Sequence, residues 1–310
     1  MIEETHLRRL ALNEFNRARR RANLSQITDR LTGRSDRLIP FETIRAEILQ
    51  RNPRSLGLQQ VPLDRIIGSV GRYREFNRQF LPLDDSLKER WVAVDTLAAS
   101  RGWPPVNLYK IGETYYVDDG NHRVSVGRQL GNSTIEAYVM EFSTEAVIRP
   151  DQTLDEMLIS LSEERFLELT RLRDHYPAHG IEFTTPGRHR ELVAQIEEMR
   201  QTLSLIDDEE WSFAEAVPAW YEMVYLPTVQ IIRESDLLDN FSGRTEADLF
   251  AWLSKHRQAL TEQLGETSSL VELAQRLADE YGESSLQKMT RKVLGIVNAE
   301  SPALLPEIAE

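Results

Sequence analysis

The chain has no cysteine among its 310 residues. This absence excludes disulfide bonds, catalytic thiolates, and zinc or iron–sulfur sites held by cysteine. Long apolar runs are missing too: no window of about 18 residues is free of charged side chains, so a membrane-spanning helix is not expected. The amino terminus has no apolar stretch typical of a signal peptide, and we expect a cytoplasmic protein without a membrane partner.

Several common functional motifs are also missing. The sequence has no Walker-type Gly-x-x-x-x-Gly-Lys stretch, no serine–histidine nucleophile arrangement, and no histidine spacing typical of a zinc site. No internal repeat with a period of about 20 to 50 residues occurs, which excludes a solenoid. A phosphate site, if present, must therefore use a different turn.

Lysine is absent from residues 1–60, where 12 arginines and 7 acidic residues give a local charge of +5. Residues 61–310 carry a charge of −18, and the whole chain has a net charge of −13. The sequence thus has a basic amino-terminal segment followed by an acidic body.

The basic segment begins with a predicted amphipathic helix. Its apolar face consists of Leu7, Leu10, Ala11, Phe15, Ala18 and Ala22. The arginines that mostly lie off this face are Arg8, Arg9, Arg17, Arg19, Arg20 and Arg21. One interpretation is a solvated helix face packed on the acidic body. The other is contact between residues 8–21 and nucleic acid, because the guanidinium group suits phosphate.

Residues 115–131 indicate a strand end, a tight turn and a short helix. Residues 118–121 form a polar break, and Gly131 stands where a helix C-terminal glycine belongs. A turn of this type directs backbone N–H groups and the positive end of the helix dipole at the space above it. With His122 and Arg123 in the first turn, the stretch predicts a phosphate site.

Composition divides the chain into three predicted parts. Residues 1–55 are a basic helical segment, residues 56–145 alternate short strands and helices, and residues 146–310 are helical in pattern. The predicted fold is therefore α+β, a small mixed α/β domain flanked by an amino-terminal helical segment and a larger all-α carboxy-terminal domain. Within the first boundary region, Phe41–Leu49 is predicted to be a helix and Ser55–Gln60 a linker.

The carboxy-terminal part contains three helix starts. They are Thr184 or Thr185 before Pro186, the Ser212–Glu215 capping box, and Thr245. Pro218 and Pro227 are expected to kink the segment that follows Ser212. The aromatic residues at helical spacing here, which include Trp252, are interpreted as core, and Arg244 beside Thr245 as part of local capping.

Residues 61–76 and 97–139, taken in order, resemble the amino-terminal domain shared by ParB partition proteins and sulfiredoxins. The shared features are an arginine-rich loop after a first strand, a helix, a Gly-Trp-Pro-Pro break, a strand pair and the Asp-Gly-Asn-His-Arg turn. This resemblance implies a domain that binds a nucleoside triphosphate, ATP or CTP, with Mg²⁺. It also implies that a Gly-x-x-Arg turn holds the phosphates.

The turn departs from both relatives. Gly120 and Arg123 match the ParB pattern, whereas Asn121, His122 and Ser125 stand where ParB has Glu, Arg and Arg. Sulfiredoxin has its catalytic cysteine at the position of Asn121, so the resemblance does not extend to sulfiredoxin activity.

A free-serine kinase of the same superfamily has the turn Asp-Gly-His-His-Arg, which residues 119–123 match more closely. Glu75 corresponds to the acidic loop residue of that kinase, and Arg74 falls on the arginine of the ParB Gln-Pro-Arg loop. In the carboxy-terminal part, residues 220–256 resemble segments of uncharacterised bacterial proteins.

The candidate site residues have the following expected roles. Gly120 allows close phosphate approach, Asn121 lies beside the bound phosphates, and Arg123 offers a planar fork. His122 donates to a phosphate or acts as acid or base. Asp118 or, preferably, Asp119 holds Mg²⁺ through phosphate or accepts a substrate proton.

The arginine-rich loop has two interpretations. Arg72, Arg74 and Glu75 form either an ordinary surface loop or a loop that closes over the phosphates, with Glu75 catalytic in the second case. Ser125 is either a plain helix residue or a phosphate ligand.

Two functional hypotheses follow from these residues. The first is a regulatory protein that binds ATP or CTP with Mg²⁺, associates with DNA through residues 8–21, and forms a homodimer. The alternative is a phosphotransferase or nucleotide hydrolase with His122, Asp119 and Glu75 as catalytic residues. A scaffold without turnover is the third reading.

Overall fold

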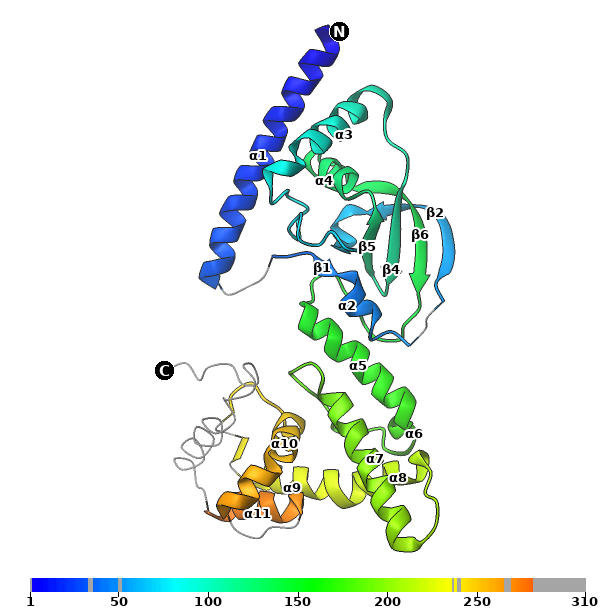
Figure 1. The fold of residues 1–310 in the computed structure, drawn as a ribbon, viewed down its shortest axis with the longest axis vertical. Coiled ribbons are helices and arrows are strands. Elements are labelled where there is room, and N and C mark those ends of the chain that lie inside the picture. The colour runs from blue at the N-terminus through cyan, green and yellow to red at the C-terminus, as the bar shows by residue number, and fades with distance from the viewer. Residues whose placement is uncertain are drawn as a thin grey trace. The chain divides into compact units, whose positions relative to one another are not determined.

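The computed structural model describes residues 2–32, 36–49, 52–235, 237–238, 241–264 and 269–280. The chain divides into two compact units, Met1–Arg165 (unit 1) and Phe166–Glu310 (unit 2). The predicted α+β class is confirmed, since unit 1 combines a six-stranded mixed sheet with helices and the described part of unit 2 is helical (Figure 1).

Unit 1 is built around one mixed sheet. Its strands are β1 (Ile39–Pro40), β2 (Arg54–Pro62), β3 (Ile66–Ser69), β4 (Val106–Ile111), β5 (Thr114–Asp119) and β6 (Thr134–Phe142). Its helices are α1 (Ile2–Thr32), α2 (Phe41–Arg45), α3 (Lys88–Arg101), α4 (Asn121–Gln129) and most of α5 (Leu154–Thr170), with 3-10 turns η1 (Leu63–Arg65) and η2 (Asp85–Leu87). The strand order is β1-β3-β5-β4-β6-β2, parallel at β1-β3, β3-β5 and β4-β6 and antiparallel at the other two pairings.

The central strand β5 supplies side chains to two cores, because successive residues of a strand point to opposite faces. Tyr115 and Val117 pack in a core with residues of α1, α3 and α4. Tyr116, between them, packs in a second core with residues of α2 and α5. Figure 1 shows α1, α3 and α4 grouped together in unit 1.

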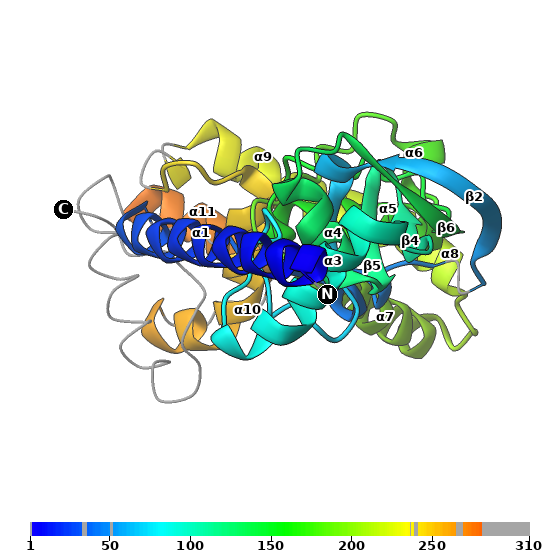
Figure 2. The same cartoon turned by 90° about the horizontal axis from the view of Figure 1, so that it is seen from above.

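The basic amino-terminal helix is confirmed and is longer than predicted. Its buried face consists of Ala11, Phe15, Ala18 and Ala22. Leu10 is 47% exposed, so the buried stripe is narrower than the predicted one. The Phe15 ring meets the Trp91 ring of α3 edge to face at 5.7 Å, and Figure 2 shows the two helices close together.

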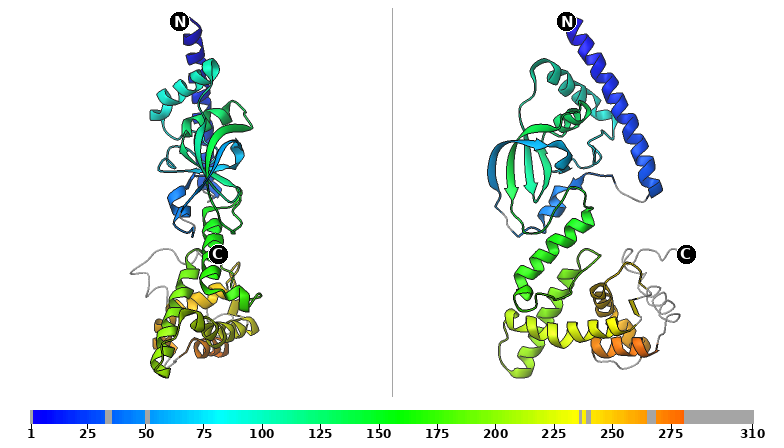
Figure 3. Two further views of the ribbon diagram at one scale, coloured as in Figure 1. Left: turned by 90° about the vertical axis from the view of Figure 1, so that its right-hand side faces the viewer. Right: turned by 180° about the vertical axis from the view of Figure 1, so that it is seen from behind.

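The predicted linker at Ser55–Gln60 is wrong, because these residues lie in β2. This strand pairs antiparallel with β6, with Val61 opposite Ile135, and forms one edge of the sheet. Most of its side chains are exposed, so it lacks the apolar alternation by which a strand is recognised. The blue strand at the edge of the sheet in the right-hand view of Figure 3 is β2. The helix predicted over Phe41–Leu49 is also shorter, since α2 ends at Arg45.

The division between the units differs from the predicted boundary after residue 145. Ile148, Met157 and Leu161 are buried in the second core of unit 1, beneath the sheet. Because of this apolar contact, the first unit extends to Arg165.

The helices of unit 2 are α6 (Leu172–His175), α7 (Arg188–Asp207), α8 (Phe213–Trp220), α9 (Leu226–Glu234), α10 (Glu246–Leu264) and α11 (Leu270–Glu280). The predicted capping box of Ser212 and Glu215 is confirmed, as is the helix start at Thr245. The expected distortion near Pro218 and Pro227 takes the form of a π-helical turn, η3 (Tyr221–Tyr225), between α8 and α9. No helix in the described part of the chain is long and apolar enough to cross a membrane.

Candidate functional site

The turn between β5 and α4 leaves the start of α4 without a side-chain cap. Gly120 occupies the N-cap position with φ of +116°, which favours glycine, and a Cβ there would lie 2.5 Å from Val106 Cγ1. Gly131 follows the helix with φ of +78°, which confirms the predicted C-terminal glycine. The first-turn N–H groups of α4 are therefore available to an anion.

Two adjacent buried side chains in this first turn have polar atoms without partners. Asn121 is 5% exposed and His122 is 4% exposed. Neither Asn121 Oδ1 nor His122 Nδ1 has a hydrogen-bond partner, although both atoms are buried. Buried polar atoms in folded proteins are nearly always paired, so two such atoms on successive residues of one turn indicate a place where a ligand supplies the bonds.

The surroundings of His122 combine an aromatic ring with the positive charges of two arginines. Its ring packs edge to face against Phe76 at 5.3 Å. Burial lowers the pKa of His122 to about 4, and the charges of Arg90 and Arg72 act in the same direction. The imidazole is therefore neutral near pH 7, with one ring nitrogen a donor and the other an acceptor.

Of these two cations, sequence reasoning predicted Arg72 and missed Arg90. Arg90 is exposed near the start of α3 and has no ion-pair partner among the described residues. An arginine at the start of a helix gives no signal in the sequence beyond that of an ordinary solvated residue. The structure brings it to the site because α3 packs beside α4.

One residue of the arginine-rich loop, Arg72, has an electrostatic effect on the candidate site, and the other two have contacts within the loop. Arg72 Nη1 lies 3.4 Å from Glu75 Oε2, so the predicted catalytic carboxylate is in an ion pair. Arg74 lies over the Tyr73 ring at 5.6 Å, and its guanidinium group is exposed. Arg72 thus remains the member of the loop with an electrostatic effect on His122.

Arg123, the predicted anion fork, is bound by groups of the protein. Its Nη1 donates to the carbonyls of Pro104 at 2.8 Å and Pro105 at 2.7 Å, and its Nη2 donates to the Asp119 carboxylate. In this arrangement Arg123 ties the Pro-Pro break to the turn and does not present a free fork.

The two carboxylates of the turn differ in their contacts. Asp119 accepts from Arg123, whereas Asp118 has no ion-pair partner among the described residues. Partial burial raises the pKa of Asp118, and the charge of Asp119 raises it further. No group of three or more His, Asp or Glu in the described residues is placed to hold a metal ion, so Mg²⁺ would need phosphate oxygens as additional ligands.

The hydroxyl of Ser125, a predicted phosphate ligand, is already hydrogen-bonded within the core. Ser125 is fully buried, donates its hydroxyl to the Phe80 carbonyl at 2.6 Å, and accepts from Trp91 Nε1 at 2.9 Å. Both roles of the hydroxyl are used within the core. Ser125 therefore fixes α4 against α3 and the loop that precedes it.

The arginines at 8–21 are mostly bound to the protein itself. Arg8 pairs with Glu89 at 2.6 Å and Arg19 with Asp85 at 3.1 Å, both near the start of α3. Arg21 donates to Gln129 at 3.2 Å. These contacts support the interpretation of a helix packed on the acidic body.

Because His122 is buried in its neutral form, the stability of unit 1 is expected to depend on pH. Its folded-state pKa of about 4 lies below the unfolded value of about 6.5, so between these values only the unfolded chain binds the proton. The contribution of His122 to the stability of unit 1 is therefore fully present above about pH 6.5, and it is lost as the pH falls below that value. We expect unit 1 to lose about 2 kcal/mol between about pH 7 and pH 5 from this residue. Urea unfolding at each pH, followed by amide hydrogen exchange of α4, measures it.

The matched control is an exposed histidine. His122→Gln removes the titrating group and should flatten the pH dependence of α4 exchange. His175→Gln, at an exposed position in α6, should leave it unchanged. If amide exchange of α4 depends on pH as steeply in His122→Gln as in the unaltered chain, the pH dependence does not come from His122.

No protein-family model matches the chain, and no curated protein matches it. Among solved structures, the chain is similar to a sulfiredoxin from Arabidopsis thaliana. The similarity covers 28% of this chain and 86% of that one, with 22% sequence identity and a TM-score of 0.20. A similarity at this level assigns neither an activity nor a ligand to this chain.

Proposed function

We propose that unit 1 binds the phosphates of a nucleoside triphosphate at the start of α4 and acts as a nucleotide-responsive regulator. The observation that carries this proposal is the pair of buried, unpartnered atoms, Asn121 Oδ1 and His122 Nδ1. They lie in the first turn of a helix without a side-chain cap, where backbone N–H groups and the helix dipole favour an anion.

Each orphaned group has a suitable partner in a nucleotide. His122 in its neutral form can donate one N–H to a phosphate oxygen. The Asn121 amide can accept from a ribose hydroxyl or a metal-bound water, or donate to phosphate once the amide is turned over. Arg72 and Arg90 add positive charge beside His122. Mg²⁺ would be held mainly by the triphosphate, with Asp118 or Asp119 as the nearest carboxylates of the turn.

The contacts support binding more than phosphate transfer. Two of the three predicted catalytic residues, Asp119 and Glu75, are in ion pairs. His122, with a pKa of about 4, is a weak base near pH 7. Asp118 has a raised pKa, but its carboxylate interacts with Tyr109, which packs in the second core on the other face of the sheet from α4.

Calorimetry of the full chain with each of the four nucleoside triphosphates and Mg²⁺ tests the proposal. Asn121→Asp places a negative charge in an almost unchanged volume and should weaken binding by about 100-fold or more. Arg90→Ala should weaken it by about tenfold through loss of one positive charge. Arg101→Ala, at the other end of α3 and exposed, is the matched control and should leave the affinity unchanged.

Three results would change the conclusion. Absence of heat with every triphosphate at about millimolar concentration would remove the nucleotide site. Nucleotide turnover that requires a small hydroxyl compound and is lost in His122→Ala or Asp119→Asn would establish the phosphotransferase instead. Salt-sensitive binding of DNA that is lost in Arg9→Gln with Arg20→Gln would add the nucleic-acid partner expected from the sequence.

A further inference from the structure

The chain between β3 and α3 contacts both the candidate site and α1, through residues 76–83, which we name the bridging segment. Within this segment, the Phe76 ring packs against His122 at 5.3 Å. The Phe80 carbonyl accepts from the Ser125 hydroxyl at 2.6 Å. The bridging segment therefore supports the first two turns of α4, where we place the phosphates.

Asn77 fixes the shape of the bridging segment. It is 3% exposed, and its Oδ1 atom accepts from the backbone N–H groups of Gln79 at 3.1 Å and Leu81 at 2.8 Å. Between these two residues, Phe80 has φ of +56°, a conformation that persists in a residue with a side chain only where the surroundings hold it. Asn77 Nδ2 donates to the Asp36 carboxylate at 2.7 Å. The conformation of the segment therefore depends on Asp36 as well as on its own residues.

The carboxy-terminal half of α1 packs on the bridging segment. Ala18 and Ala22 are fully buried in a cluster with Leu81. Between the two alanines in the sequence, Arg19 donates to the Pro82 carbonyl at 3.1 Å, and its side chain is 18% exposed. The helix thus contacts the segment both through apolar surface and through a hydrogen bond from a charged group.

The same helix also contacts Asp36. The Ser25 hydroxyl donates to Asp36 Oδ2 at 2.5 Å, and this oxygen also accepts from Asn77. Because one carboxylate oxygen binds both side chains, a movement of α1 away from Asp36 alters the contacts of the residue that shapes the segment. A continuous series of contacts therefore joins α1 to His122 through Asp36, Asn77 and its neighbour Phe76.

The attachment of α1 is weak for a helix of 31 residues. Among its described side chains, the buried ones are Phe15 and three alanines, which remove little apolar area from water. Its ion pair between Arg8 and Glu89 joins side chains that are 59% and 75% exposed, and such pairs contribute little. A helix held in this way separates from its domain at a lower free energy than that of global unfolding. α1 therefore has a docked state and an accessible undocked state.

We propose that docking of α1 is coupled to occupancy of the candidate site through the bridging segment and Asp36. A ligand that orders His122 stabilises the segment, and the segment in turn stabilises the docked helix. Asp36 and Asn77 are positioning residues, because they act on His122 through Phe76. The coupling rests on the proposed function, since the ligand is the triphosphate. Linkage makes it reciprocal, so docking of α1 raises the affinity of the site by the same factor, typically about 5- to 150-fold.

Hydrogen exchange of the full chain measures the coupling. Saturation with the Mg²⁺ complex of ATP or CTP should slow the exchange of α1 amides by about fivefold or more. Arg19→Gln combined with Ser25→Ala removes the hydrogen bonds of α1 to Pro82 and Asp36 and leaves the residues of α4 unchanged. In this double variant the slowing should fall below about twofold, and calorimetry should show binding weakened by about threefold or more.

A second measurement needs no ligand. NMR titration of the His122 ring compares the pKa of this residue in the unaltered chain and in the double variant. If the bridging segment loosens, the ring becomes more hydrated, and its pKa should rise by about 0.5 or more toward the ordinary value of about 6.5. A loss of α1 contacts without coupling to the site would leave this pKa unchanged.

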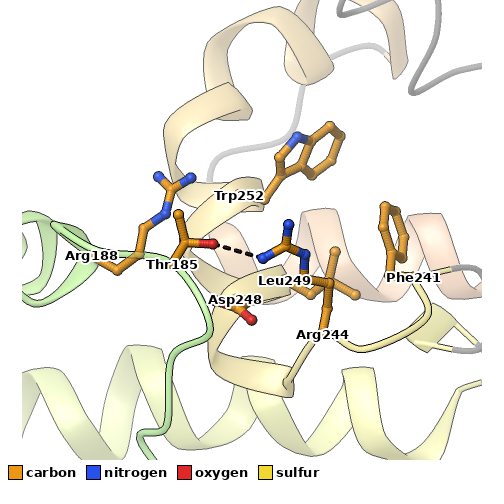
Figure 4. Close-up of a pocket in the computed structure, with 7 residues that line it drawn as sticks. All are labelled: Thr185, Arg188, Phe241, Arg244, Asp248, Leu249 and Trp252. Atoms are coloured by element: carbon orange, nitrogen blue, oxygen red, sulfur yellow. Dashed lines mark hydrogen bonds between the residues drawn. The ribbon is translucent and has the colours of Figure 1, made fainter. Parts of the chain in front are cut away.

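Two controls match the arginine lost at Arg19. Arg17→Gln removes an arginine of the same helix that donates to Glu14 and is 72% exposed. Arg244→Gln removes an arginine of unit 2 that donates to the Thr185 hydroxyl at 2.7 Å (Figure 4). Both controls should leave α1 exchange, the imidazole pKa and the triphosphate affinity as they are in the unaltered chain.

The coupling is absent if a triphosphate that binds leaves α1 exchange unchanged, or if α1 exchanges faster in the double variant while the pKa of His122 stays the same. It is also absent if either control behaves like the double variant. If the double variant fails to fold, Ser25→Ala alone takes its place. If no triphosphate binds, the proposed function fails, and the pKa of His122 in the double variant decides the coupling between α1 and the site by itself.

Discussion

Gly120→Ala is expected to destabilise unit 1 by about 3 to 5 kcal/mol and to abolish nucleotide binding. A Cβ at this position would lie 2.5 Å from Val106 Cγ1 and 2.9 Å from Val106 Cβ, and Val106 is the buried first residue of β4. The backbone φ of +116° adds a conformational cost for any residue with a side chain. The clash with Val106 is relieved either by a shift of the turn, which moves Asn121 and His122, or by a displacement of β4.

The other end of the same helix provides the matched control. Gly131 has φ of +78°, and a Cβ there would meet no atom within 4 Å. Gly131→Ala should therefore cost about 1 kcal/mol, for the backbone alone, and leave the nucleotide affinity unchanged. Urea unfolding followed by hydrogen exchange of β5 and α4 amides compares the two variants. Similar losses in both would mean that the close approach to Val106 is not what requires glycine.

Arg128→Met is expected to destabilise unit 1 by about 3 kcal/mol or more. The Arg128 guanidinium donates to the carbonyls of Ile66 at 2.8 Å, Arg78 at 3.1 Å and Leu63, and lies 5.1 Å from the centre of the Phe80 ring. Burial lowers its pKa to about 10, so it remains charged near pH 7. Methionine keeps most of the apolar stem but leaves three carbonyls without this donor.

Two further variants separate charge from geometry. Arg128→Lys keeps the positive charge but replaces the planar fork with a compact ammonium group, and should lose about half as much stability as Arg128→Met. Arg101→Met, at an exposed arginine, should lose less than about 0.5 kcal/mol. Guanidinium chloride is unsuitable here because of its ionic strength, so urea unfolding monitored by hydrogen exchange of unit 1 measures the series. Equal stability of Arg128→Met and the unaltered chain would show that water replaces the guanidinium at the carbonyls.

The buried centre of unit 1 could be predicted from the sequence, and its edge could not. The end of β5 and the helix α4 were predicted from residues 115–131, because their burial imposes a clear period on the apolar residues. β2 has the same hydrogen-bonded backbone, but most of its side chains face solvent, so nothing in its composition distinguishes it from a linker. The strand β2 is ordered by its hydrogen bonds to β6, which are not visible in the sequence of β2 itself.

The backbone of the turn at the candidate site was predicted from the sequence, whereas the contacts of its side chains were not. Gly120 and His122 follow from the turn pattern, because backbone conformation and helix polarity are local properties. Contacts with distant residues decide the rest: Arg123 is bound by Pro104, and Ser125 by Phe80. Such non-local contacts are not visible in periodicity or spacing, and Arg90 was missed for the same reason.

The pairing of β2 with β6 has a consequence for how the chain folds during its synthesis. Val61 lies opposite Ile135, so the ribosome makes β2 74 residues before its partner exists. At typical elongation rates this interval lasts about 4 to 15 s, during which β2 has two open edges. An apolar strand would be prone to aggregation in that time. The polar composition of Arg54–Gln60, which conceals the strand in the sequence, keeps it solvated until β6 arrives.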